Sequence, residues 1–304
     1  MKKVAIVGAN AYIARNLIHF MHSKSNDYQL KLYDIQDEHM DKEKCYLPIN
    51  ISDEKSVMGI DFDCDFLFMF VGKTGTLNAF DEIDTFIDIN EKAMLNVLNA
   101  HQKKQSKAKI VFPSTRLVYK GVKGSKLKEC DEKEFKTIYA INKYACEQYL
   151  QMYQRVHGVP YNIFRICVPY GTLIKGASSY GTAEFMLSRA TKGENIPLYG
   201  DGKIRRTLIF IEDLCHFLLE GAQSQDCIND VYNIGGEDYS LLEMAEKIAF
   251  EYNVKVEHIP WPEKALLIES GDTVFDSEKL ESIIGSYKYK KFADWCKEQR
   301  TIVA

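Results

Sequence analysis

The chain has 304 residues, 46% of them hydrophobic, which is enough apolar material to bury one large core or two smaller ones. Its formal net charge is −4, and charges of both signs are spread along the chain, so we expect no nucleic-acid partner. No stretch approaches the roughly 18 apolar residues of a membrane span, and the first apolar run is too short for a signal peptide, so we expect a cytoplasmic protein with no membrane partner.

In the first half, short β-branched runs alternate with amphipathic stretches, which is typical of repeated βαβ units around a buried parallel sheet. In chain order the sequence predicts strands at 4–7, 29–34, 62–72, 108–115 and 159–168, and helices at 11–23, 89–105 and 138–158, the last ended by Gly158. The fold class is therefore α/β, with a Rossmann-type doubly wound parallel sheet.

The second half has frequent glycine and proline, with short helices at 183–193 and 241–252. The shift in composition near residue 168 predicts a dinucleotide-binding domain at 1–168 and a smaller mixed α/β domain at 169–304. Residues 207–222 have strand-then-helix character, and we expect them to return to the first domain and add to its sheet. The eight cysteines never form a CxxC pair, so we expect reduced thiols and no metal site.

The stretch GANAYIA follows the first strand, at the turn where a parallel sheet of this kind holds a pyrophosphate against a helix N-terminus. Nucleotide-binding loops place glycine at the first, fourth and seventh positions, where this chain has Gly8, Ala11 and Ala14. An ordinary βα turn is the alternative. Asp34 ends the second strand, where a carboxylate binds the adenosine ribose and repels a 2′-phosphate, which favours NAD over NADP; a turn-capping residue is the alternative.

Tyr139 and Lys143 lie at i and i+4, so on a helix they share a face, and the ammonium can stabilise the phenolate. The YxxxK spacing also occurs at Tyr119 and Tyr287, so spacing alone does not select the pair. Tyr139 is the one of the three on a predicted helix that follows the strand 108–115, whose end offers Thr115 as a hydroxyl partner.

The ordered motifs VGANAYIA, Asp34, FVGKTGT, PSTRLVY, YAINK and GDGKIRRTLIFIEDL resemble those of the extended short-chain dehydrogenase/reductases, the NAD-dependent nucleotide-sugar epimerase/dehydratase family, to about residue 285. The resemblance implies that Tyr139 is the general acid/base and that Lys143 lowers its pKa and holds the nicotinamide ribose. It also implies that the hydroxyl of Thr115 binds the reacting sugar oxygen, and that the second domain binds the nucleotide-diphosphate sugar.

The same resemblance implies the remaining binding residues. Arg206 matches an arginine that pairs with a substrate phosphate, with Arg205 as the competing choice and a surface charge as the alternative. Asn90, at the head of the predicted helix, matches a position near the cofactor or is simply an N-cap, and Lys73 contacts the cofactor or projects into solvent. The implied cofactor-binding set is Gly8, Asn10, Ala11, Tyr12, Ile13, Asp34, Asn50, Ile51, Phe70, Val71, Gly72, Lys73, Asn90, Tyr139 and Lys143.

Three departures from the family pattern bear on the reaction. Arg116 and Leu117 stand where dehydratases carry an Asp-Glu pair, which disfavours dehydration. Val168 replaces a frequent asparagine, and LLIES, before GDT, lacks an arginine that often contacts the second phosphate. The leading hypothesis is an NAD-dependent epimerase that transiently oxidises sugar C4.

Two alternatives stay open beside the epimerase. One is an NAD(P)H-dependent 4-ketoreductase of a 4-keto-6-deoxy sugar nucleotide, which needs the same hydroxyl, tyrosine and lysine. The other is a non-catalytic dinucleotide-binding sensor or scaffold. The resemblance further implies a homodimer, formed through the helix 89–105 and the helix that carries Tyr139.

Overall fold

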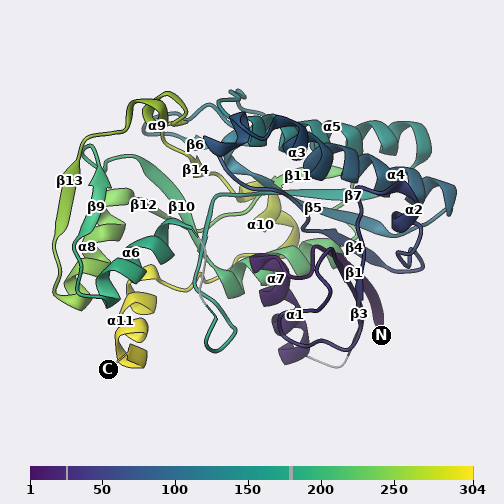
Figure 1. The fold of residues 1–304 in the computed structure, drawn as a ribbon, viewed down its shortest axis with the longest axis horizontal. Coiled ribbons are helices and arrows are strands. Elements are labelled where there is room, and N and C mark those ends of the chain that lie inside the picture. The colour runs from purple at the N-terminus through teal and green to yellow at the C-terminus, as the bar shows by residue number, and fades with distance from the viewer. Residues whose placement is uncertain (25–26, 178–180, 304) are drawn as a thin grey trace.

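The largest element of the fold is a parallel sheet, seen edge-on at the right of Figure 1. A computed structural model describes residues 1–24, 27–177 and 181–303. Among these residues the sheet has seven strands, in the order β11 (Asp230–Asn233), β7 (Tyr161–Ile166), β5 (Lys109–Thr115), β4 (Phe66–Met69), β1 (Lys2–Val7), β2 (Tyr28–Asp34) and β3 (Tyr46–Pro48). Every neighbouring pair is parallel, which confirms the predicted fold class.

The sheet has a hydrophobic core on each face. Along β1, Val4 and Ile6 belong to one core and Ala5 and Val7 to the other, because successive side chains of a strand point to opposite faces. Helices cover both faces, as Figure 1 shows, which makes the sheet doubly wound. They are α1 (Tyr12–Lys24), α7 (Ile211–Gln223) and α10 (Glu278–Ile284) on one side, and α2 (Glu54–Val57), α3 (Ile83–Ile87), α4 (Ala93–Lys103) and α5 (Ile138–His157) on the other.

The remaining strands form small sheets in the part of the chain shown at the left and top of Figure 1. They are β8 (Val168–Tyr170), β10 (Arg205–Phe210) and β12 (Glu237–Ser240) in one sheet, β9 (Ile196–Tyr199) with β13 (Val256–Ile259), and β6 (Lys126–Leu127) with β14 (Val274–Phe275). The helices of this part are α6 (Thr182–Thr191), α8 (Leu241–Tyr252), α9 (Glu263–Leu267) and α11 (Phe292–Val303).

The structure corrects the expectation for residues 207–222. The helix α7 does pack against α1 and the large sheet, but its preceding strand β10 pairs with β8 and β12 instead. The edge beside β7 is taken by β11, which lies later in the chain and was not predicted. The division of the chain at residue 168 stays a prediction, since one continuous core joins both parts.

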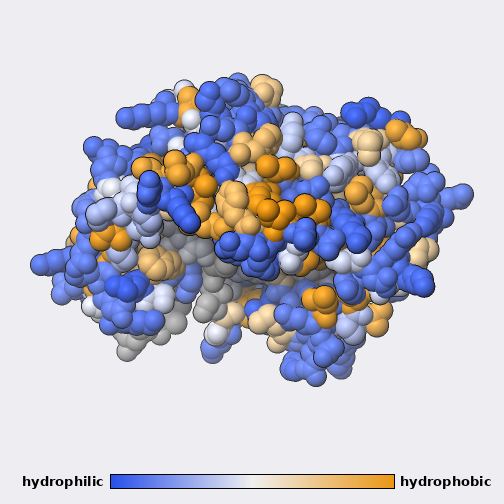
Figure 2. All heavy atoms as spheres, turned by 45° about the horizontal axis from the view of Figure 1, so that its top comes forward, coloured by the Kyte–Doolittle hydropathy of each residue, from blue (hydrophilic) through white to orange (hydrophobic). Residues whose placement is uncertain are grey.

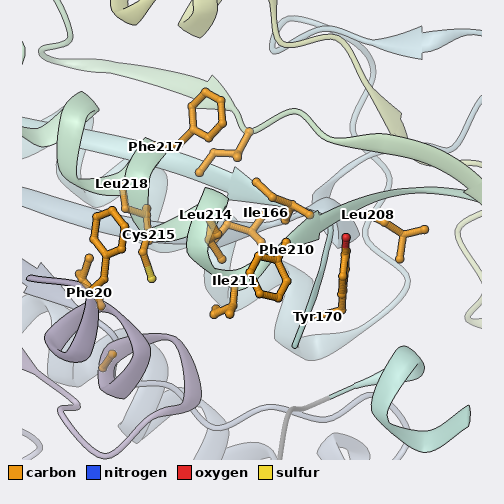
Figure 3. Close-up of a cluster of buried hydrophobic side chains, with 14 of the residues drawn as sticks. Phe20, Ile166, Tyr170, Leu208, Phe210, Ile211, Leu214, Cys215, Phe217 and Leu218 are labelled. Atoms are coloured by element: carbon orange, nitrogen blue, oxygen red, sulfur yellow. The ribbon is translucent and has the colours of Figure 1, made fainter. Parts of the chain in front are cut away.

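That shared core is drawn in Figure 3. Phe20 comes from α1, Phe217 from α7, and Tyr170 and Phe210 from the small three-stranded sheet. The ring of Tyr170 packs 5.6 Å from that of Phe210 and 5.1 Å from that of Trp295 in α11. No helix among the described residues is long and apolar enough to cross a membrane.

Candidate functional site

The turn between β1 and α1 lies at the carboxyl end of the sheet, against the segment that follows β4. Gly8 has φ +87°, and a Cβ there would lie 2.5 Å from the backbone nitrogen of Val71. Only glycine fits this approach, because the backbone occupies the side-chain space and the φ is left-handed. Phe70 and Val71 lie against this turn, and the N–H of Phe70 donates to the carbonyl oxygen of Val7 at 2.7 Å.

The backbone N–H groups from Gly8 to Ala11 all donate within the protein. Two go to the carbonyl oxygen of Tyr33, at 2.8 and 3.0 Å, one to a carboxylate oxygen of Asp34 at 2.9 Å, and one to the carbonyl of Gly8 at 3.0 Å. Because a helix leaves the N–H groups of its first turn without intrahelical acceptors, the start of α1 is the end of this helix that could receive an anion.

Asp34 acts as a cap in this structure and also faces the turn. Its second oxygen accepts the N–H of Ile35 at 2.7 Å. The side chain of Asn10 is directed to the segment after β2, where it donates to Gln36 at 2.9 Å and accepts from the N–H of Met40 at 2.8 Å. Asn10 thus fixes this segment, and the side chain of Asp34 lies beside the turn.

Further along the same edge, β2 and β3 end beside an open hollow of about 410 Å³. Asn50 lines it, and its side-chain oxygen accepts the N–H of Ser52 at 3.0 Å. Ile51 is buried in the core. The structure therefore places Asn50 at a surface that could receive a ring, and Ile51 behind it.

Lys143 is buried on α5 with few partners. Its Nζ donates to the carbonyl of Pro113 in β5 at 2.9 Å and lies 5.9 Å from the ring centroid of Tyr139. Burial lowers the pKa of this ammonium to about 8. A Cβ on Gly72 would lie 3.7 Å from Nζ, an ordinary van der Waals distance, so the segment after β4 passes close to the lysine.

Tyr139 and Thr115 flank this lysine. Tyr139 is half-buried in the first turn of α5, which Thr137 caps by accepting the N–H of Ala140 at 3.1 Å. Thr115 ends β5, and its hydroxyl accepts the N–H of Leu117 at 3.2 Å. A hydroxyl has one proton to donate, and no described residue accepts that of Thr115, so it is available to a ligand.

Asn90 and Lys73 are found in roles that the sequence did not indicate. Asn90 lies in a π-helical turn, Asp88–Lys92, between α3 and α4, so its placement at the head of a helix was wrong. Its side chain accepts the N–H of Lys73 at 2.7 Å and donates to the carbonyl of Lys73 at 3.1 Å. The ammonium of Lys73 pairs with Glu82 at 2.6 Å. Asn90 therefore fixes the backbone of the segment that passes Lys143.

A buried polar network behind these residues was missed. The carboxylate of Glu147, one turn after Lys143, pairs with Arg165 in β7 at 2.6 Å and accepts the hydroxyl of Ser114 at 2.5 Å. Arg165 also donates to the hydroxyl of Tyr119 at 2.7 Å. The sequence spacing could have indicated one member of this network, because Glu147 lies at i+4 from Lys143 and shares its helix face. The network ties α5 to the strands that end at the site.

Comparisons with known proteins agree with this geometry. The family model for the NAD dependent epimerase/dehydratase family matches residues 4–235. The chain belongs to this family. A UDP-N-acetyl-alpha-D-glucosaminuronate decarboxylase of Bacillus cytotoxicus is 27% identical over 224 residues, covering 71% of this chain and 68% of that protein.

Two solved structures of family enzymes have the same fold. UDP-glucose 4-epimerase of Thermus thermophilus, in complex with NAD, superposes with a TM-score of 0.85 at 19% identity, covering 99% of this chain and 98% of that one. dTDP-glucose 4,6-dehydratase of Bacillus anthracis, also with NAD, gives 0.84 at 18% identity, covering 99% and 96%. This chain is thus an NAD-dependent enzyme of the epimerase/dehydratase family, and the turn at Gly8 and the first turn of α1 fit its cofactor.

The arginines expected to bind substrate phosphate are both paired within the protein. Arg206 is buried, not a surface charge, and its guanidinium pairs with Glu269 at 2.5 Å and donates to the carbonyl of Gly271. Arg205 is half-buried and pairs with Asp238 at 2.8 Å. Glu269 lies in LLIES, the segment that lacks the arginine expected from the family pattern. In this chain the segment instead supplies a carboxylate that pairs with Arg206.

Proposed function

We propose that this chain is an NAD-dependent epimerase that inverts C4 of a nucleotide-diphosphate sugar by transient oxidation. The observation that carries the proposal is the buried Lys143 ammonium beside Tyr139, at the end of the strand that presents Thr115. A tyrosine with a pKa near 10 is a poor base at neutral pH, and a fixed cation in a site of low dielectric lowers that pKa.

Each of the three residues has a definite task in this reaction. Tyr139 takes the proton from the C4 hydroxyl and later returns it to the C4 oxygen. Lys143, mostly charged at pH 7 with a pKa of about 8, stabilises the phenolate and is within reach of a ribose held beside Gly72. The hydroxyl of Thr115 donates a hydrogen bond to the same sugar oxygen and keeps its proton. NAD, when bound, supplies acceptance and return of the C4 hydride.

One feature supports epimerisation over dehydration, and another supports NAD as the cofactor. Leu117 stands where a dehydratase pattern has its acid, so this segment offers no carboxyl group to expel water. Asp34 and the acidic residues that follow it, Asp37 and Glu38, oppose a 2′-phosphate, which supports NAD as the cofactor.

The proposal includes a homodimer in the cytoplasm, formed through α5, as expected from the sequence, and through α3 in place of the helix 89–105. Figure 2 shows hydrophobic residues gathered on the face that carries α3 and α5. Ile83 and Ile87 of α3, and Ile141 and Val156 of α5, are exposed there, from 43% to 67%. Burying this face against a second copy would remove them from water.

The test is a substrate panel. The purified protein is incubated with UDP-, dTDP-, GDP- and CDP-sugars, the released cofactor is identified by mass spectrometry, and sugars are separated by chromatography. The proposal expects bound NAD and a C4 epimer without added cofactor. Stoichiometric loss of 340-nm absorbance with a 4-keto-6-deoxy sugar nucleotide and NADH would show a ketoreductase instead. Turnover unchanged by Tyr139→Phe would refute the site, and NAD binding without any turnover would indicate a sensor.

A further inference from the structure

Arg116 is a second cation in the substrate half of the site, one residue after Thr115. Its guanidinium donates to the hydroxyl of Ser270 at 2.9 Å. Arg116 is half-buried, and partial desolvation, with a contribution from Arg206, lowers the pKa of its guanidinium to about 10. A guanidinium is rarely desolvated in this way unless an anion compensates the cost.

The charges around Arg116 do not balance. Arg206 repels it, and the thiol of Cys167 is neutral because burial raises its pKa. Glu269 lies near but is committed to Arg206, and no carboxylate among the described residues comes within 4.0 Å of the Arg116 guanidinium. Two arginines and one glutamate leave one positive charge uncompensated beside Thr115.

We propose that Arg116 binds an oxyanion of the substrate, and that this oxyanion is a carboxylate carried by the sugar. The inference rests on the proposed function, in which Thr115 meets the reacting hydroxyl, so that its neighbour in the chain reaches other substituents of the same ring. A planar guanidinium can hold a carboxylate with two parallel hydrogen bonds. Ser270 orients the guanidinium from the opposite segment.

The experiment measures binding of three ligands to the full chain loaded with NAD by isothermal titration calorimetry. The ligands are UDP, UDP-glucose and UDP-glucuronate, which share a nucleotide and differ in the sugar and its charge. The variants are Arg116→Met, which keeps the aliphatic packing, and Arg116→Lys, which keeps the charge. Arg189→Met, on α6, serves as the matched control, because that arginine already has an acidic partner in Glu194.

The proposal expects the native protein to bind UDP-glucuronate more tightly than UDP-glucose. Arg116→Met should weaken the binding of UDP-glucuronate about 10- to 100-fold and change the affinities for UDP and UDP-glucose by no more than about twofold. Arg116→Lys should restore part of the loss. The unfolding temperature of ligand-free Arg116→Met should not fall below that of the native protein, because the change removes a half-buried cation that has no carboxylate partner.

Other results would overturn the proposal. If Arg116→Met weakened the binding of all three ligands equally, Arg116 would contact the diphosphate that they share. If binding were unchanged, Arg116 would make no contact with the substrate. A large loss of stability in ligand-free Arg116→Met would make the arginine a structural residue. Binding of none of the ligands by the native protein would count against the proposed function as well, which separates the two failures.

Discussion

Two buried lysines in this chain invite a direct comparison. Lys143 and Lys109 are 6% and 7% exposed. The Lys109 ammonium donates to three carbonyl oxygens, those of Ala222, Ser224 and Cys227, at 2.9 to 3.0 Å. The Lys143 ammonium donates to one protein carbonyl, so the folded protein without NAD holds a poorly solvated charge there.

The substitution Lys143→Met should therefore stabilise the NAD-free protein at pH 7. Lowering the pKa of Lys143 from 10.5 to about 8 corresponds to a penalty of about 3 kcal/mol, and losing the hydrogen bond to Pro113 costs about 1 kcal/mol. The net gain is about 2 kcal/mol. The penalty is full below pH 8, shrinks as the folded protein loses this proton, and is gone above pH 10.5, so the gain should disappear across that window.

The assay is urea unfolding of the NAD-free protein at pH 7, 9 and 10.5, followed by circular dichroism. Lys109→Met is the matched comparison, and it should destabilise the protein, because buried carbonyl oxygens lose their donor. The reasoning is refuted if the two substitutions lower the free energy of unfolding equally. With NAD bound, Lys143→Met should be less stable than the native protein, because the variant would lose the proposed contact of Lys143 with the ribose.

Three further predictions follow from the same structure. Glu147→Gln should cost about 3 to 5 kcal/mol in thermal or urea unfolding by leaving a buried guanidinium without its counter-charge, whereas Glu54→Gln, in an exposed pair, should leave stability nearly unchanged; similar effects would contradict this. Gly8→Ala should weaken NAD binding at least about tenfold in a fluorescence titration, since the methyl meets backbone; native affinity would argue against the turn as the cofactor site. In light scattering, Ile141→Asp should convert a dimer to a monomer and Phe250→Asp, exposed on α8, should not; a native protein that is monomeric at all concentrations would remove the dimer.

Local sequence patterns were sufficient to predict the part of the site that is formed by one helix and one turn. The spacing of Tyr139 and Lys143 predicts a shared helix face, and Gly8 follows a short apolar run, so both features depend on neighbours in the sequence. The structure places them as expected, with Lys143 buried beside the ring of Tyr139. The assignment of Tyr139 as the acid/base stays a prediction.

Long-range pairing decided what the sequence could not predict. β10 has the composition of a sheet strand, but its partners β8 and β12 are separated from it by long stretches of chain. In the same way, Arg206 looked available to a phosphate because its partner Glu269 lies 63 residues later. Asn90, in the π-helical turn, hydrogen-bonds to Lys73 and to Asn142 of α5, and no helical periodicity reveals these contacts.

The most direct test of the central claim follows the hydrogen at C4. A nucleotide sugar that the enzyme converts is synthesised with deuterium at C4, incubated with the purified protein without added cofactor, and its epimer is examined by mass spectrometry and NMR. Transient oxidation predicts that the epimer retains deuterium at C4 and that no NADH appears in solution. Loss of the deuterium to solvent, or its transfer to free NAD, would contradict the account.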